Sequence, residues 1–154
     1  MPLRIQLEDV IETLSFGEAP AATIRVRHLR SGHRVEAQEA AADRRGVVDE
    51  EALRVELDGL SIPGWDGVED IEGRPVPFEA PPAFVEEAAR ANAALGEKAL
   101  PPKALARRAQ ARWVSRVLGG FPGPVRDKID ATRFGDLAQV NRALGNSAGP
   151  SVNA

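Results

Sequence analysis

Residues 62–78 read IPGWDGVEDIEGRPVPF, and this stretch separates two segments that have helical patterns. It contains three glycines, three prolines and one of the two tryptophans of the chain. Glycine and proline at such spacings end helices and form turns, so the preceding helix stops here. We therefore expect an irregular hairpin near residues 65–78, attached to the neighbouring helices by Trp65, Val76 and Phe78.

The segments on both sides of this insert predict helices. Asp49 is a candidate N-cap for a helix over Glu50–Leu60, whose leucines and valine offer an inward face. After the insert, the Pro81-Pro82 pair opens a helix over Ala83–Leu95, because proline in the first turn costs no hydrogen bond. The insert is thus expected to lie between two helices that pack on a common core.

The strongest helical pattern covers Pro101–Leu118. This segment begins with proline, ends at a Gly-Gly pair and carries apolar residues, including Trp113, at every fourth position. Beyond it, two short helices are expected over Val125–Ile129 and Asp136–Leu144. The last residues, 146–154, are polar and predict a flexible tail.

The residues before the insert have weaker patterns. Leu3–Leu14 spaces its apolar residues by three and four, which predicts a helix, although its first five residues also alternate like a strand. Ala22–Leu29 alternates apolar and basic side chains, which is typical of a half-buried strand. Ser31 can cap an alanine-rich helix that runs to about Arg45.

These elements define the expected fold class as mainly α, a helical domain with a minor β element. The β element consists of a short strand near residues 22–29 and the irregular hairpin near residues 65–78. A chain of 154 residues is long enough for one domain with a real core. We expect a single helical domain over residues 1–145, followed by the tail.

Charge is distributed unevenly along the chain. Residues 1–97 hold 20 acids and 10 bases, a balance of −10, whereas residues 98–154 hold 3 acids and 10 bases, a balance of +7. These add to the net charge of −3. Such polarity can direct the two ends toward different partners or toward each other in a neighbouring copy, and the alternative is two solvated faces of one domain.

The helix over Pro101–Leu118 carries most of this positive charge. Five cations on one helix could neutralise nucleic-acid phosphates, but the chain as a whole is acidic and no aromatic platform accompanies them. The alternative is an amphipathic helix whose long basic side chains shield a core or meet an acidic partner. The cations are Lys103, Arg107, Arg108, Arg112 and Arg116.

No residue pattern points to catalysis, a cofactor or a metal. The chain has no cysteine, and its two histidines, His28 and His33, are five positions apart without a paired metal-ligand motif. We therefore expect both histidines to be ordinary surface residues. No nucleophile, base and orienting group can be placed together, so the expected protein is not an enzyme and has no catalytic, cofactor or metal residues.

Four carboxylates gather within seven residues of the insert. They lack the D-x-[DN]-x-[DN]-G pattern of a calcium loop, and glycoside hydrolysis would need a cleft lined by aromatics that this composition hardly supplies. A solvated acidic loop is the expectation. The four residues are Asp66, Glu69, Asp70 and Glu72.

The composition also bounds the compartment. No apolar run approaches the roughly 18 residues needed to span a bilayer, so no membrane partner is expected. The first residues, MPLRIQLEDVIE, place acids where a signal peptide needs its apolar centre. Together with the lack of cysteine, this favours the cytoplasm or a particle assembled there.

Three stretches resemble the tail assembly chaperone type of small proteins from tailed bacteriophages. The stretch Thr23–Gly32 is similar to the extended segment and capped helix that open this group. The helix Glu50–Leu60 and the following Ser61–Val68 resemble its "helix, Ile, Gly-Trp, Gly-Val" junction. The stretch Glu69–Phe78 resembles its acidic "D-x-x-G-x-P-x-P-F" turn, so that the likeness covers about residues 22–95.

This resemblance implies a non-enzymatic helical protein of the host cytoplasm. Such a protein binds the tape measure protein, or tail-tube components, and keeps its client soluble while the tail is built. It also implies a homo-oligomer, since one unit covers little of a long client. The alternatives are a structural subunit of the virion tail or connector and, second, a small nucleic-acid-binding protein that uses the helix 101–118, although nucleic acid is not an expected partner.

The expected contact surfaces are the alanine-rich segment Ser31–Arg45 and the face around Trp113. Exposed apolar grooves or stripes on helices are what binding to another helix requires. Partner-binding residues are nominated from the two tryptophans, one phenylalanine and the arginines of the basic helix. They are Trp65, Phe78, Trp113, Arg107, Arg108, Arg112 and Arg116.

Overall fold

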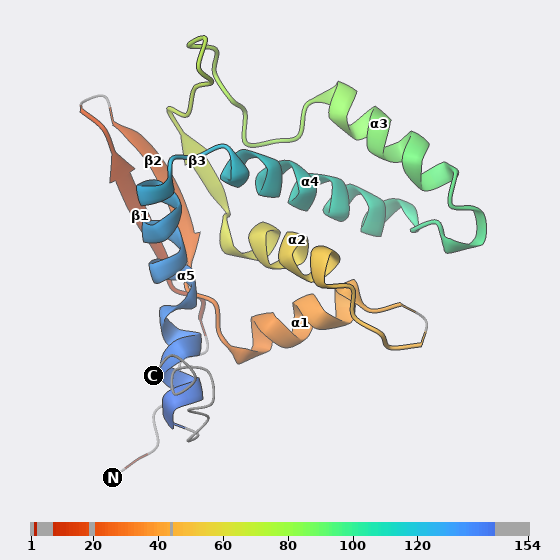
Figure 1. Cartoon of the computed structure of the whole chain (residues 1–154), viewed down its shortest axis with the longest axis horizontal. Helices are drawn as coiled ribbons and strands as arrows, with labels where there is room; N and C mark the ends of the chain where they lie inside the picture. The colour runs from red at the N-terminus through yellow and green to blue at the C-terminus, as the bar shows by residue number, and fades with distance from the viewer. Residues whose placement is uncertain (1, 3–7, 19–20, 44, 144–154) are drawn as a thin grey trace.

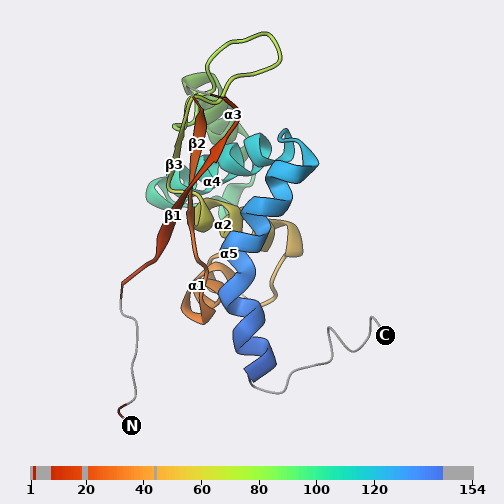
Figure 2. The same cartoon turned by 90° about the vertical axis from the view of Figure 1, so that its left-hand side faces the viewer.

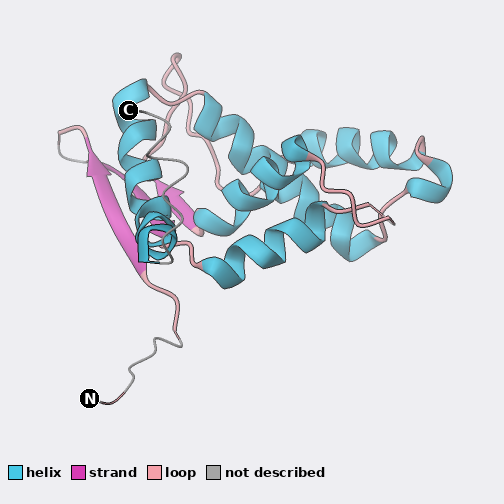
Figure 3. Ribbon diagram, turned by 60° about the horizontal axis from the view of Figure 1, so that its bottom comes forward, coloured by secondary structure: helices cyan, strands magenta, loops and turns pink. Residues whose placement is uncertain are grey.

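The structure is a computed structural model that describes residues 2, 8–18, 21–43 and 45–143, with side chains described through residue 135. The described residues form five α-helices and a small three-stranded antiparallel sheet, and about 55% of the chain is helical. Figure 3 shows the sheet at one side of a mostly helical molecule. The expectation of a mainly α fold with a minor β element is confirmed.

The sheet has the order β1-β2-β3, from β1 (Ile11–Phe16), β2 (Ala22–Arg27) and β3 (Gly64–Asp66). Its register places Ile24 opposite Leu14 on one side and opposite Trp65 on the other. The predicted strand near residues 22–29 is therefore the central strand. The start of the predicted hairpin supplies the third.

The helix predicted over Leu3–Leu14 is wrong where the structure describes it. Residues 11–14 belong to strand β1, residues 8–10 are not helical, and residues 3–7 lie outside the described residues. Pairing with β2 satisfies the backbone groups of this segment, and Leu14 is its one buried side chain. Long-range pairing thus overrides a helical spacing that offered few buried contacts.

Four helices lie side by side beyond the sheet in the order α1, α2, α4, α3 (Figure 1). Their bounds are α1 (Ser31–Ala41), α2 (Glu50–Ser61), α3 (Pro82–Ala93) and α4 (Pro102–Gly119), and a short 3₁₀ turn (Gly96–Lys98) joins α3 to α4. Helices α2 and α4 approach closely at Gly59, where an added Cβ would lie 2.7 Å from the Cβ of Ala111. A larger residue there would push the two helices apart.

Helix ends agree with expectation at α2 and differ at α1. The Asp49 carboxylate accepts a hydrogen bond from the backbone N–H of Glu51, as expected for the N-cap of α2. At α1 the N-cap is Arg30 rather than Ser31, and its backbone N–H donates to the ring of His33. Helix α1 ends at Ala41, short of Arg45, because Ala42 forms a β-bridge with Val48.

The last described helix is α5 (Gly123–Ala143), which lies along the sheet (Figure 2). The two short helices expected over Val125–Ile129 and Asp136–Leu144 are one continuous helix through residue 143. No proline lies between Pro124 and the end of the helix at Ala143, and Gly135 costs only about 1 kcal/mol inside a helix, so nothing local stops it. The predicted tail, residues 146–154, lies outside the described residues.

The main core lies between the sheet and helices α4 and α5. It gathers apolar side chains from strands, from two helices and from the segment that follows α2. Helices α1 and α3 lie outside this cluster, and no residue of α3 is fully buried. The buried members are Leu14, Ile24, Val26, Ile62, Trp65, Val114, Leu118 and Ile129.

The rest of the insert is a turn held by Asp70. Its carboxylate accepts hydrogen bonds from the backbone N–H groups of Glu72 and Arg74 and from the Arg74 side chain, at 2.9 Å each. Glu69 forms a β-bridge with Pro75, and Gly73 has a φ of +80° that other residues rarely adopt. The acidic stretch is thus an exposed turn that the hydrogen bonds to Asp70 stabilise.

We expect the pKa of the Asp70 carboxyl to lie below its ordinary value of 3.8. The backbone N–H of Arg74 lowers this pKa most, partial burial opposes it, and the remaining bonds from Arg74 and Glu72 lower it further. The turn is therefore held fully above pH 3.8 and loosens as the pH falls through the lower folded value. Carboxyl ¹³C shifts followed against pH measure this, and an Asp70 that titrates at or above 3.8 would contradict it.

Candidate partner-binding groove

The structure places Trp65 inside the core. Its side chain is 4% exposed, and its indole N–H donates to the carbonyl of Val76 at 2.8 Å. The ring of Phe78 packs edge-on against it, with the ring centres 5.0 Å apart. These two nominated residues close the insert onto the sheet, so in this conformation a partner does not reach Trp65.

Trp113 is half-buried and joins α4 to the chain that leads into α3. Its indole N–H donates to the carbonyl of Pro77 at 2.9 Å, and its ring packs against Phe84 of α3 at 5.4 Å. One turn before it, Gln110 bonds to the carbonyl of Phe78 and to the backbone N–H of Ala80. The face around Trp113 is therefore largely covered by the chain itself.

The nominated arginines of α4 fall into two groups. Arg108 donates to the carboxylate of Glu56 at 2.6 Å and to the carbonyl of Ala40 at 3.0 Å, which ties α4 to α2 and α1. Arg107 lies 3.6 Å from the same carboxylate. Since Glu56 is itself buried, these two arginines serve the fold.

Arg112 and Arg116 form the second group. Both are exposed and lie one turn apart on α4, and neither has an ion-pair partner within the described part of the chain. Like Lys103 and Lys98, they carry positive charge that the described structure does not neutralise. The sequence alone did not separate them from Arg107 and Arg108.

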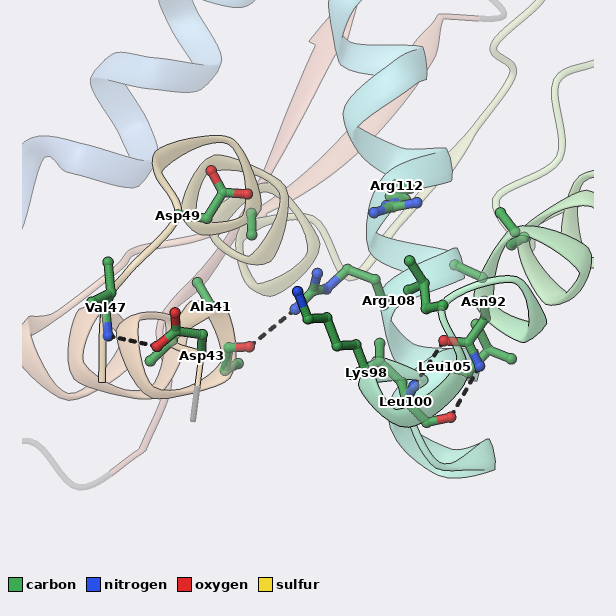
Figure 4. A pocket seen from close by; sticks show the side chains of 17 residues that line it. Ala41, Asp43, Val47, Asp49, Asn92, Lys98, Leu100, Leu105, Arg108 and Arg112 are labelled. Atoms are coloured by element: carbon green, nitrogen blue, oxygen red, sulfur yellow. Dashed lines mark hydrogen bonds between the residues drawn. The ribbon is translucent and has the colours of Figure 1, made fainter. Parts of the chain in front are cut away.

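A groove runs along α4 beside Lys98 and Arg112 (Figure 4). Its cavity has a volume of about 470 Å³ and an open mouth. Leu105 and Ala109 of α4 form its floor, and Ala91 and Leu95 line it from the α3 side. The opposite side is formed by the end of α1 and by the connection to α2, at residues 40–43, 47 and 49.

The groove continues past Arg112 into a second hollow of about 450 Å³ between α2 and α4. The two hollows share four lining residues, so they adjoin along α4, and we refer to them together as the channel. The first hollow is mainly apolar, and the second is lined by arginines of both helices together with two carboxylates. The shared residues are Asp49, Ala52, Arg108 and Arg112.

Internal bonds hold the ends of the groove in place. The side-chain amide of Asn92 exchanges two hydrogen bonds with the backbone of Leu100, at 2.8 and 3.0 Å, which closes the connection from α3 to α4 (Figure 4). On the α1–α2 side of the groove, the carboxylate of Asp43 accepts hydrogen bonds from the backbone N–H groups of Arg45 and Val47. The groove is therefore built before any partner arrives.

The sequence suggested that both histidines are ordinary surface residues, but each lies within hydrogen-bond distance of a carboxylate in a cluster of charged side chains. His33 lies 3.1 Å from Asp9, and His28 lies 3.3 Å from Glu12. Asp9 also pairs with Arg27 and Arg30, both at 3.1 Å. This cluster joins the residues before and in β1 to the junction of β2 and α1, and no spacing in the sequence signals it.

The charges around Asp9 shift its titration. Partial burial raises the pKa of the Asp9 carboxyl, but the charges of Arg27 and His33 and the hydrogen bonds from Arg30 and His33 outweigh burial. The net pKa lies below 3.8, so Asp9 remains ionised at neutral pH. The ionised Asp9 therefore holds the residues before β1 against the end of β2 and the start of α1.

Comparisons with models of protein families, with curated proteins and with solved structures find no match for this chain. Within the described ranges, no group of three or more His, Cys, Asp or Glu side chains could hold a metal ion. None of the described helices is long and apolar enough to cross a membrane.

Proposed function

We propose that this chain is a non-enzymatic tail assembly chaperone of a tailed bacteriophage. It would bind the tape measure protein, or tail-tube components, in the host cytoplasm and keep the client soluble during assembly. The resemblance behind this proposal covers about residues 22–95, which run from β2 to just past the end of α3. The expected homo-oligomer belongs to the same proposal.

The observation that carries the proposal is the open groove along α4. It is preformed, is lined by apolar and small side chains from three parts of the chain, and has unpaired cations at one end. Such a surface suits a segment of another protein, because apolar contacts supply affinity and charges supply orientation. Chaperoning needs this kind of surface and no bond-making chemistry.

The resemblance also gains a physical explanation. The residues that carry it in the turn are those that close the insert: Trp65 donates to Val76, and Gly67 has a φ of +72° beside the backbone of Ala22. Pro77 receives the hydrogen bond of Trp113. The shared pattern is thus a structural unit that positions α3 beside α4, which supports placing client contacts on the helices.

Co-expression with the tape measure protein of the same genome tests the proposal. We expect the client to move from the insoluble to the soluble fraction when this chain is present and to co-purify with it. We also expect the chain to be missing from purified phage particles by mass spectrometry. A client whose solubility does not change, together with this chain in particles at fixed copy number, would favour the virion-subunit alternative.

A further inference from the structure

Helix α3 is incompletely covered in the isolated chain. Phe84, Ala88 and Ala91 of α3, and Leu95 just after it, lie at helical spacings. Trp113 packs against Phe84, Ala88 is half-buried and Ala91 is exposed. At the other end Leu95 is 54% exposed and lines the groove with Ala91. This stripe of apolar residues is therefore packed against α4 at its first residue and exposed to solvent at its last. An exposed apolar stripe of this kind is typical of a helix that binds a further element.

The surface of α4 along the channel is long enough to hold a helix. Leu105, Ala109, Arg112, Arg116 and Gly119 follow one another along one face of α4. From Leu105 to Gly119 the helix rises by 14 steps, which corresponds to about 21 Å. Alanines along the channel let a second backbone come close, as helix pairs require.

Some of the charged groups that line the channel are paired: Glu51 with Arg54, and Arg108 with Glu56. The carboxylates of Asp43 and Asp49 accept hydrogen bonds from backbone N–H groups and keep their negative charge. Arg112 and Arg116 have no such partner within the described residues. An occupant that carries carboxylates beside these two arginines would neutralise them.

From these three observations we infer that the channel over α4 binds an acidic amphipathic helix of a partner protein. The apolar face of that helix lies on Ala91, Leu95 and Leu105, and its Asp or Glu residues lie beside Arg112 and Arg116. The inference adds the docking site and the chemistry of the ligand to the proposed function. It does not depend on the partner being a phage protein.

A synthetic peptide tests the inference directly. The probe is a fluorescein-labelled helical peptide of about 15 residues, with leucines at spacings of three and four on one face and glutamates in its last two turns. We expect saturable binding in fluorescence anisotropy, weakened by salt because the charges are exposed. A peptide with lysines in place of the glutamates should bind at least about tenfold more weakly.

Paired variants locate the binding. Arg112→Glu with Arg116→Glu should weaken binding of the glutamate peptide at least about tenfold and restore binding of the lysine peptide, whereas Lys103→Glu on the same helix should change neither much. Ala91→Trp should fill the groove and abolish binding. Ala89→Trp, at an exposed position on the other side of α3, should leave it intact.

Some outcomes would overturn the inference. These are no binding of the glutamate peptide up to about 1 mM, equal binding of both peptides, or equal loss in Ala91→Trp and Ala89→Trp. Circular dichroism of each variant shows whether its fold is intact. If the chain solubilises the tape measure protein but does not bind the peptide, the proposed function stands and the channel is not the docking site. If it binds the peptide but does not solubilise the tape measure protein, the docking site stands and the proposed phage client is wrong.

Discussion

Replacement of Trp65 by alanine is expected to lower the free energy of unfolding by about 3–5 kcal/mol. The ring is 4% exposed and lies in the main core, where its removal leaves a cavity that the surrounding strands cannot fill. The same change deletes the hydrogen bond to Val76 and the ring contact with Phe78. Val76 and Phe78 would then lose these contacts with β3, while the backbone pairing of β3 with β2 remains.

Urea denaturation followed by circular dichroism measures this loss. Ile71→Ala is the matched control, because Ile71 lies in the same insert and is fully exposed. That variant should stay within about 0.5 kcal/mol of the wild-type value. A Trp65→Ala protein that is less than about 1 kcal/mol destabilised would show that the ring does not fill the core.

Replacement of Arg133 by methionine is expected to cost a similar amount, about 3–5 kcal/mol. The guanidinium of Arg133 donates to Asp58 at 2.6 Å and to Ser61 at 3.1 Å, and Asp130 lies at 2.7 Å. The side chains of Arg133 and Asp58 are only 11% and 8% exposed. Without the arginine, the carboxylate of Asp58 stays buried without its counter-charge, and α5 loses its tie to α2.

A second variant separates charge from packing. Arg133→Met combined with Asp58→Asn removes both charges, so it should be clearly more stable than Arg133→Met alone. Arg126→Met, an exposed arginine of the same helix, is the control and should change stability by less than about 0.5 kcal/mol. Equal losses in the single and double variants would contradict a role for the buried pair.

Local chemistry made much of the helical part predictable. The Asp49 cap, the Pro-Pro openings of α3 and α4 and the Gly-Gly end of α4 each act within a few residues, and the helices start and stop close to them. The same reasoning failed at β1. There, the deciding interaction is pairing with β2, which no spacing within residues 3–14 reveals.

The candidate site was predictable only as a set of residues. The sequence pattern singled out all four arginines of α4 between residues 107 and 116. It did not show that the buried Glu56, 52 positions before Arg108, pairs with Arg107 and Arg108. Trp65 and Trp113 read alike in the sequence, yet one fills the core and the other joins two helices. The groove itself involves residues from α1, α2, α3 and α4.

The amino-acid sequence by itself determined where most helices begin and end and where the turn of residues 62–78 interrupts them. Caps, prolines and glycines act on the backbone within one or two turns, so no distant residue is needed. The tertiary structure alone decided that residues 11–16 form a strand, which arginines remain unpaired and that a channel opens over α4. Those outcomes depend on backbone segments and charged side chains that lie tens of residues apart in the sequence. Packing between them, unlike helix capping, cannot be read from the residues next to each position.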